Sequence, residues 1–130
     1  MNPVTDNHLP TTAAYGSSVT TPFTQIASEL QQALGQRLVA YAAKVGSPKN
    51  VGRWAAGTSD ARQEAELQVR SLYRAVRILR DDAELSDEGI RAWLLSANPE
   101  LDDQTPIERL RDGGSVRVCH AAASFVSLIA

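Results

Sequence analysis

The sequence predicts an all-α protein with an N-terminal helix-turn-helix unit, a long central helix and a small C-terminal helical unit. Alternating runs of β-branched residues are absent, and the apolar residues recur at helical spacing throughout the chain. Glycine and proline residues divide these apolar series into short segments. The 130 residues fit either one domain with a tail or two small helical units that share a core.

The first part of the chain changes character near residue 20. Residues 1–20 are rich in Thr, Ser, Asn and Pro and contain little to bury, so we expect them to form a flexible arm. Thr21 is then expected to cap a helix that has Pro22 in its first turn. The apolar residues of this helix lie at helical spacing: Phe23, Ile26, Leu30 and Leu34.

Residues 34–57 predict two short helices joined by a tight turn. Three apolar residues form one face of the first helix: Leu38, Ala42 and Val45. Gly46 interrupts this helix, and Ser47 with Pro48 supply a cap and a first position for the second helix, which ends at Gly57. This order is typical of a helix-turn-helix unit.

Residues 59–82 contain no glycine or proline and predict the longest helix. Its apolar stripe consists of Leu67, Val69, Leu72, Val76 and Leu79. Its polar stripe carries four arginines, Arg70, Arg74, Arg77 and Arg80. Ser86 is expected to cap the next helix, which bears Trp93 and which Pro99 prevents from continuing. We expect Trp93 to be buried.

Thr105 to Glu108 form the clearest local signal in the chain. Thr105 can accept a hydrogen bond from the backbone N–H of Glu108, and the Glu108 side chain can accept one from the N–H of Thr105. Pro106 supplies the fixed φ at the first helical position. Gly113 permits a left-handed exit, and a last helix is expected over residues 115–130.

Charge is divided between the two halves of the chain, although the net charge is only −2. Residues 23–80 contain nine basic and four acidic side chains, whereas residues 81–130 contain four basic and ten acidic ones. A basic half and an acidic half often serve different partners. The alternative is that both halves simply present solvated helix faces.

Several classes of site are disfavoured. The single cysteine, Cys119, excludes a disulfide framework and indicates a reducing compartment, so we expect a cytoplasmic location. His8 and His120 lie in unrelated regions, which argues against a zinc site, and we expect no bound metal or cofactor. Adjacent residues on a helix diverge, so Cys119 and His120 do not form a catalytic dyad. Asp102 and Asp103 lack the spaced oxygen ligands of a calcium loop. We expect neither catalysis nor a membrane segment.

The second helix of the helix-turn-helix unit carries the candidate DNA-binding residues. Lys49, Asn50 and Arg53 lie near its N-terminus, with Val51 and Trp54 on the opposite, buried face. Asn pairs well with adenine and Arg with guanine in the major groove. The alternative is that the two cations only solubilise the helix. The segment from Gln36 to Gly57 resembles Xre-type helix-turn-helix regions.

A second resemblance lies in the stretch "AWLLSANPELDDQTPIERLRDGG", residues 92–114. It is similar to the C-terminal toxin-binding domain of the Xre/MbcA/ParS antitoxins, in which a Trp-bearing helix, Asn-Pro, Leu and a Pro-led short helix ending in Gly follow in order. The matching residues are Trp93, Leu94, Asn98, Pro99, Leu101, Pro106, Leu110 and Gly113. The resemblance covers roughly residues 21–130.

This resemblance implies a type II antitoxin. Residues 21–82 would form the dimerising, promoter-binding region and residues 83–130 the region that neutralises a RES-domain toxin, an enzyme that consumes NAD. The candidate toxin-binding residues are Asn98, Pro99, Arg111, Val126, Leu128, Ile129 and Ala130. We expect Phe125 and Ile129 to pack inward, with Leu128 and Ala130 exposed to plug the toxin's active site. The alternative is a free-standing Xre-like repressor without a toxin partner.

Overall fold

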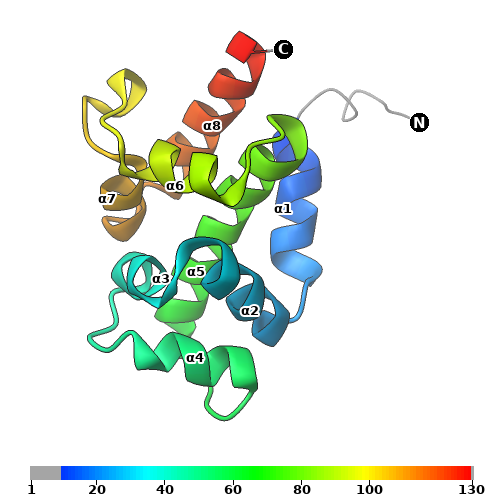
Figure 1. Cartoon of the computed structure of the whole chain (residues 1–130), viewed down its shortest axis with the longest axis vertical. Coiled ribbons are helices and arrows are strands. Elements are labelled where there is room, and N and C mark those ends of the chain that lie inside the picture. Colours follow the sequence, from blue (N-terminus) through cyan, green and yellow to red (C-terminus); the bar gives the residue numbers. More distant parts are fainter. Residues whose placement is uncertain (1–9, 130) are drawn as a thin grey trace.

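The computed structural model describes residues 10–129, and within that range every regular element is a helix, which confirms the all-α prediction (Figure 1). The elements in chain order are α1 (Pro10–Thr20), α2 (Phe23–Leu34), α3 (Gln36–Ala43), α4 (Lys49–Ala56), α5 (Gln63–Arg77), the π-helical turn η2 (Ile78–Asp82), α6 (Asp87–Leu95), the 3₁₀ turn η3 (Pro99–Leu101), α7 (Pro106–Arg111) and α8 (Ser115–Ile129).

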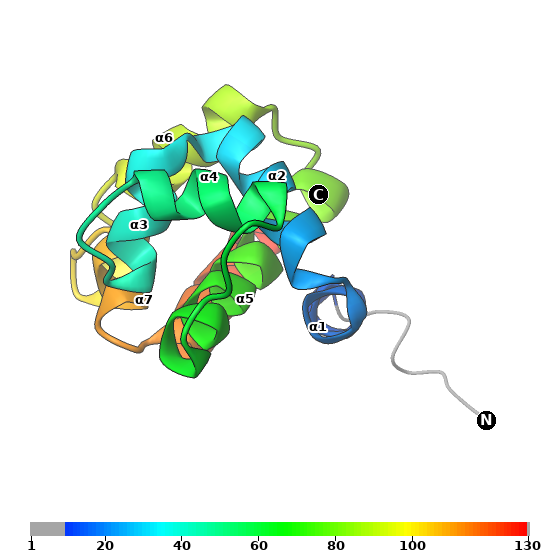
Figure 2. The ribbon, with the colours of Figure 1, turned by 90° about the horizontal axis from the view of Figure 1, so that it is seen from below.

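Helix α5 is the centre of the structure. It packs against α1, α2, α3, α7 and α8, and Figures 1 and 2 show these helices arranged around it. Its inward face is apolar, with Val69, Leu72 and Val76 fully or almost fully buried. The buried side chains of both halves of the chain form one cluster. The N-terminal and C-terminal parts therefore share a single core instead of having one each.

Helix α1 corrects the expectation of a flexible arm over residues 1–20. Residues 10–20 are helical and pack on α5, whereas residues 1–9 lie outside the described range. Ala14 and Ser18 are buried in this contact. Arg70 of α5 donates to the carbonyl oxygens of Ser18 at 3.0 Å and Thr21 at 2.8 Å. These polar bonds, which the composition of α1 does not reveal, offset the small apolar area that the helix buries.

Three details of the N-terminal half differ from the sequence-based expectation. Thr21 does not cap α2, which follows Pro22 without a side-chain cap. Helix α3 ends at Ala43, before Gly46 is reached, because the next residue, Lys44, adopts a left-handed φ of 62°. Leu67, assigned to the apolar stripe of the long helix, is 58% exposed because it faces away from the core.

The boundaries of the C-terminal half follow the predicted signals. The Ser86 side chain caps α6 by accepting from the backbone N–H of Gly89 at 3.1 Å. Thr105 and Glu108 form the expected capping box at the start of α7. Gly113 has the left-handed φ of 91° that allows the chain to turn into α8.

Candidate functional site

The exposed side of α4 carries two of the three candidate DNA-binding residues. Lys49 and Arg53 are exposed, and Asn50 is half-buried. The opposite face is fixed in the core by Val51, which is fully buried, and Trp54, which is 3% exposed. Helix α4 thus presents two cationic side chains on its exposed side, Lys49 at its first residue and Arg53 in its last turn.

Asn50 and Arg53 do not act as independent groups in this structure. The guanidinium Nη1 of Arg53 donates to the side-chain oxygen Oδ1 of Asn50 at 3.1 Å. Asn contacts adenine through both its oxygen and its NH₂, and the Arg53 bond already occupies one of the two lone pairs of the Asn50 oxygen. The geometry instead gives Asn50 the role of holding the Arg53 side chain.

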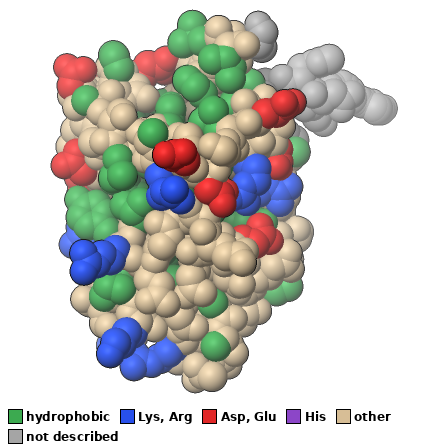
Figure 3. Space-filling model, in the orientation of Figure 1, with side chains coloured by type: hydrophobic (Ala, Val, Ile, Leu, Met, Phe, Trp, Pro, Cys, Tyr) green, Lys and Arg blue, Asp and Glu red, His purple; other side chains and the backbone are tan. Residues whose placement is uncertain are grey.

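The predicted basic half has cations of two kinds. The four arginines of α5 and η2 are used within the molecule, in ion pairs or in hydrogen bonds to α1: Arg70, Arg74, Arg77 and Arg80. The other five Lys and Arg side chains of residues 23–80 form no ion pair with any residue from 10 to 129. We call these five the basic surface: Arg37, Lys44, Lys49, Arg53 and Arg62. In Figure 3 the lower part of the molecule, over α3 and α4, shows Lys and Arg but no Asp or Glu.

The segment from 98 to 114, which we call the α7 loop, is held mainly by its own hydrogen bonds. The side-chain oxygen of Asn98 accepts from the backbone N–H of Glu100 at 2.9 Å, and its carbonyl accepts from Leu101 and Asp103. Asn98 is half-buried, whereas Pro99 is exposed. Asn98 is thus committed to shaping the loop, and Pro99 is accessible to a partner.

Arg117 ties this loop to α8, and Arg109 braces it from within. The Asp102 carboxylate lies 3.3 Å from Arg117 and 3.2 Å from Arg109, and hydrogen bonds from these two guanidiniums lower the pKa of Asp102. Arg117 also donates to the carbonyl of Glu100 at 2.7 Å. A side chain at Gly114 would lie 2.6 Å from the aliphatic chain of Arg109, so only glycine fits where α7 turns into α8. The loop therefore fixes the base of α8.

Arg111, a candidate toxin-binding residue, contacts the N-terminal half of the protein. Its Nη1 donates to the carbonyl oxygen of Tyr41 at 2.7 Å, and its guanidinium carbon lies 4.6 Å from the centre of the Tyr41 ring. Gln68 reinforces this junction, since its side-chain nitrogen donates to Ala42 at the end of α3 and to Leu110 at the end of α7. Nothing in the sequence indicates these contacts, which join residues far apart in the chain.

The last turn of α8, residues 126–129, carries the apolar side chains Val126, Leu128 and Ile129. Leu128 is 81% exposed as expected, but Ile129 is 51% exposed, which corrects the expectation that it packs inward. Val126 is half-buried, and Ala130 lies outside the described residues. Phe125 packs on Trp93 with 6.5 Å between ring centres, and Phe125 and Val126 both pack against the core. Figure 1 shows the end of α8 projecting past α6 and α7.

Cys119 and His120 are neighbours on α8 but differ in exposure. Burial raises the pKa of the Cys119 thiol, whereas the neighbouring His120 is exposed. Within residues 10–129, no three His, Cys, Asp or Glu side chains are placed to hold a metal ion. No helix in the same range is both long and apolar enough to cross a membrane.

Comparison with known proteins adds no relative. No family model, no curated protein and no solved structure matches this chain.

Proposed function

We propose that the protein is an antitoxin that neutralises a RES-domain toxin with the end of α8 and represses its own promoter through α3 and α4, acting as a homodimer. The observation that carries the proposal is the exposed apolar end of α8. Leu128 and Ile129 would insert into the toxin's cleft and exclude NAD from it. The protein itself is not an enzyme in this proposal, and it uses no cofactor.

The way α8 is held supports this role. An exposed apolar surface attracts nonspecific contacts unless a partner covers it. Here the base of α8 is fixed by Arg117 on the α7 loop, and its middle is anchored by Phe125 on Trp93. A rigid helix that holds apolar side chains away from the body loses little conformational entropy when a partner covers them.

The basic surface supports the second half of the proposal. The short helices α3 and α4 are joined by a turn, and α4 packs closely on α2. Arg53 and Lys49 project from α4 on the side opposite its buried face. Operator DNA is the polyanion for which such a surface is suited.

The α8 end can be tested with two charge substitutions and a matched control. Leu128→Asp with Ile129→Asp should abolish inhibition of the toxin's NAD hydrolysis, because burial of two unpaired carboxylates in an apolar contact is costly. Val116→Asp is the control, since Val116 is also an exposed apolar side chain of α8 (64% exposed) but lies at the opposite end of the helix. Deletion of residues 126–130 should match the double variant.

Two results would separate this proposal from its alternative. Full inhibition by the double aspartate variant would show that α8 does not occlude the toxin. Promoter binding without any capture of a tagged RES-domain toxin would instead favour a free-standing repressor, for which the basic surface alone suffices.

A further inference from the structure

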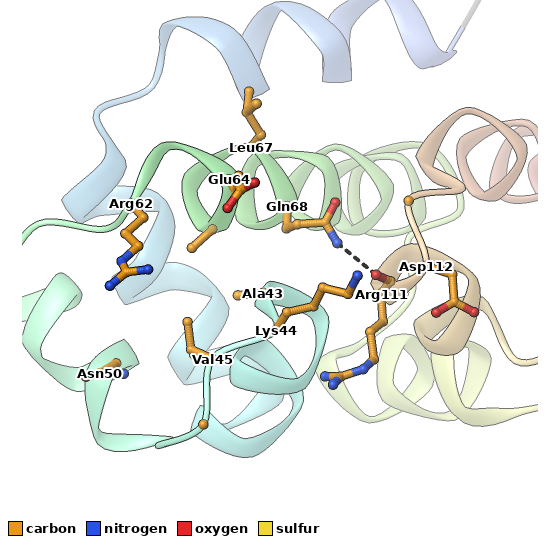
Figure 4. Close-up of a pocket in the computed structure, with 13 residues that line it drawn as sticks. Ala43, Lys44, Val45, Asn50, Arg62, Glu64, Leu67, Gln68, Arg111 and Asp112 are labelled. Carbon is orange, nitrogen blue, oxygen red and sulfur yellow. Dashed lines mark hydrogen bonds between the residues drawn. The ribbon is translucent and has the colours of Figure 1, made fainter.

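An open cleft lies where the α3–α4 turn, the start of α5 and the end of α7 meet, and its volume is about 670 Å³ (Figure 4). Its apolar lining consists of Ala43, Val45 and Ala65, of which the two alanines are buried. Polar and charged side chains surround this lining, so the cleft offers both apolar contact and hydrogen bonds. It joins elements of both halves of the protein and lies apart from the projecting end of α8 (Figure 1).

A second hollow of about 330 Å³ lengthens this cleft along α4 and adds one cation, Arg53, and one carboxylate, Asp60. Four residues line both hollows, which therefore form one continuous groove: Val45, Asn50, Arg62 and Ala65. An extended polypeptide rises about 3.3 Å per residue and presents side chains along its whole length. A long groove that is open to solvent suits such a chain better than a compact ligand.

Two exposed cations, Lys44 and Arg62, lie at different ends of the cleft. Neither forms an ion pair with any residue from 10 to 129. Figure 4 shows the Lys44 side chain directed along the cleft toward Gln68 and the end of α7, whereas Arg62 lies on the side of Asn50. Lys44 has a left-handed φ of 62°, which residues other than Gly and Asn seldom adopt at a helix end. The chain leaves α3 in this conformation, and the lysine lines the cleft instead of extending the helix.

The cleft also carries two carboxylates, Glu64 and Asp112, which form no ion pair within the described chain. A nucleic acid has backbone charges of one sign only, so its phosphates would be repelled by these carboxylates. A protein segment can instead place acidic side chains beside Lys44 and Arg62 and apolar side chains between them. The mixed charges and the apolar lining therefore favour a polypeptide over DNA.

Two side-chain amides of the groove retain hydrogen-bonding groups for a peptide backbone. Gln68 donates from its nitrogen to the carbonyls of Ala42 at 3.0 Å and Leu110 at 2.8 Å, and its oxygen accepts no hydrogen bond from residues 10–129. Asn50 accepts from Arg53 through its oxygen, and its nitrogen donates to no residue in the same range. An extended backbone exposes its N–H and C=O groups, whereas a helix bonds them internally. The Gln68 oxygen can accept from such an N–H, and the Asn50 nitrogen can donate to such a carbonyl.

We infer that this groove binds an extended acidic segment of a partner protein. One carboxylate of the segment pairs with Lys44 and another with Arg62, and a small aliphatic side chain between them packs on Val45 and the neighbouring alanines. Charge-assisted hydrogen bonds to the two cations orient the segment, and the apolar contact adds affinity. The groove lies apart from the exposed side of α4 and from the end of α8, so this binding requires neither the proposed DNA contact nor the proposed toxin contact.

The experiment measures the fluorescence anisotropy of a labelled peptide, in which two glutamates flank a short run of valine and alanine, as the full chain is added. One control peptide has glutamine in place of the glutamates, and another has serine in place of the valines. The glutamate peptide should bind about fivefold more tightly than either control, because the first control loses the charge pairs and the second loses the apolar contact.

Variants of the two cations test the site itself. Lys44→Asn with Arg62→Gln removes both charges and keeps, at position 44, a residue type that tolerates a left-handed φ. This double variant should bind the glutamate peptide about tenfold more weakly at an unchanged thermal midpoint, since two exposed ion pairs are lost. Arg37→Gln with Lys49→Gln is the matched control, because both residues are exposed members of the basic surface but neither lines either hollow. Glu64→Gln should tighten binding, because it removes a carboxylate that repels the peptide.

Several outcomes would overturn the inference. Equal losses in the two double variants would show that the peptide responds to overall charge and not to the cleft. Equal binding of the glutamate and glutamine peptides would show that the cleft takes no acidic segment. Displacement of the peptide by glutarate at an equal concentration would show that a small dicarboxylate is the ligand. A promoter affinity that falls as much as the peptide affinity in Lys44→Asn with Arg62→Gln would assign the two cations to DNA.

Discussion

Arg111 and Tyr41, 70 positions apart in the chain, bond the end of α7 to the end of α3. The Arg111 guanidinium donates to the Tyr41 carbonyl at 2.7 Å and lies over the Tyr41 ring. A cation at a helix C-terminus is favourable because the last carbonyls lack helical partners. The bond therefore joins the proposed DNA-binding half to the proposed toxin-binding half at a helix end.

Removal of this bond should weaken the fold. Arg111→Ala should lower the free energy of unfolding by about 1–2 kcal/mol, since a hydrogen bond from a charged group and a ring contact are lost at a half-buried site. Tyr41→Phe should have no effect, because the carbonyl and the ring both remain. Urea unfolding measures the free energy of unfolding of both variants. Loss of toxin inhibition in Arg111→Ala at unchanged stability would instead show that Arg111 contacts the toxin directly.

Helix α1 should contribute to stability, contrary to the sequence-based expectation for residues 1–20. Arg70→Ala removes hydrogen bonds to the Ser18 and Thr21 carbonyls and should cost about 1–3 kcal/mol. Arg37→Ala is the control, as Arg37 is exposed and forms no ion pair within the described residues. A chain beginning at Thr21 should melt at a lower temperature than the full chain. An unchanged thermal midpoint would mean that α1 does not pack on α5 in solution.

Trp93 should matter less to stability than full burial had suggested. The ring is half-buried and packs against Phe125, so Trp93→Ala should cost about 2–3 kcal/mol, below the range for a fully buried tryptophan. Leu95→Ala, two positions on and 52% exposed, should change stability by less than about 0.5 kcal/mol. Guanidinium unfolding compares the two. If stability is unaffected and toxin binding is lost, Trp93 is an interface anchor.

The α7 loop should loosen in acid. Hydrogen bonds from Arg117 and Arg109 lower the pKa of Asp102 from its ordinary 3.8. A carboxyl with a lowered pKa in the fold stabilises it above its ordinary pKa, and this contribution is lost as the pH falls through the folded value. Stability should therefore fall below about pH 4, and Asp102→Asn should remove part of this dependence. The measurement is the free energy of unfolding of the wild type and of Asp102→Asn at several values between pH 5 and pH 2. The same pH dependence in both proteins would contradict the prediction.

Local sequence signals correctly predicted several helix boundaries in the C-terminal half. The capping box of Thr105 with Glu108, the Ser86 cap and the Gly113 exit each depend on residues a few positions apart. Such features are determined by short-range hydrogen bonds and φ preferences, so they can be read from the sequence without knowledge of the fold.

Contacts between distant residues explain what the sequence did not reveal. Helix α1 has few apolar residues to bury, and its partners Arg70 and Arg74 lie about 50 positions away. A separation of 70 positions likewise keeps the Arg111–Tyr41 bond from being predicted. Helical spacing assigned Leu67 and Ile129 to buried faces, but spacing does not show where a neighbouring helix ends. The sequence placed Lys49, Asn50 and Arg53 together on α4, but it did not reveal the hydrogen bond between Asn50 and Arg53.

The bond between Asn50 and Arg53 makes a specific prediction for the proposed DNA binding. If Arg53 reads a base and Asn50 only holds it, Arg53→Ala should weaken promoter binding by about 1–3 kcal/mol and relax the preference at one base pair. Asn50→Ala should cost less, and should cost nothing further in a chain that already carries Arg53→Ala.

Fluorescence anisotropy with the promoter duplex and with single base-pair replacements measures all four members of this cycle. Lys49→Ala serves as the comparison, because an exposed lysine that contacts only phosphate should weaken all duplexes alike and reduce the salt dependence by about 1. Additive losses from Asn50→Ala and Arg53→Ala, each at a different base pair, would show that the bond between them breaks on DNA. Asn50 would then read a base itself, as its residue type alone had indicated.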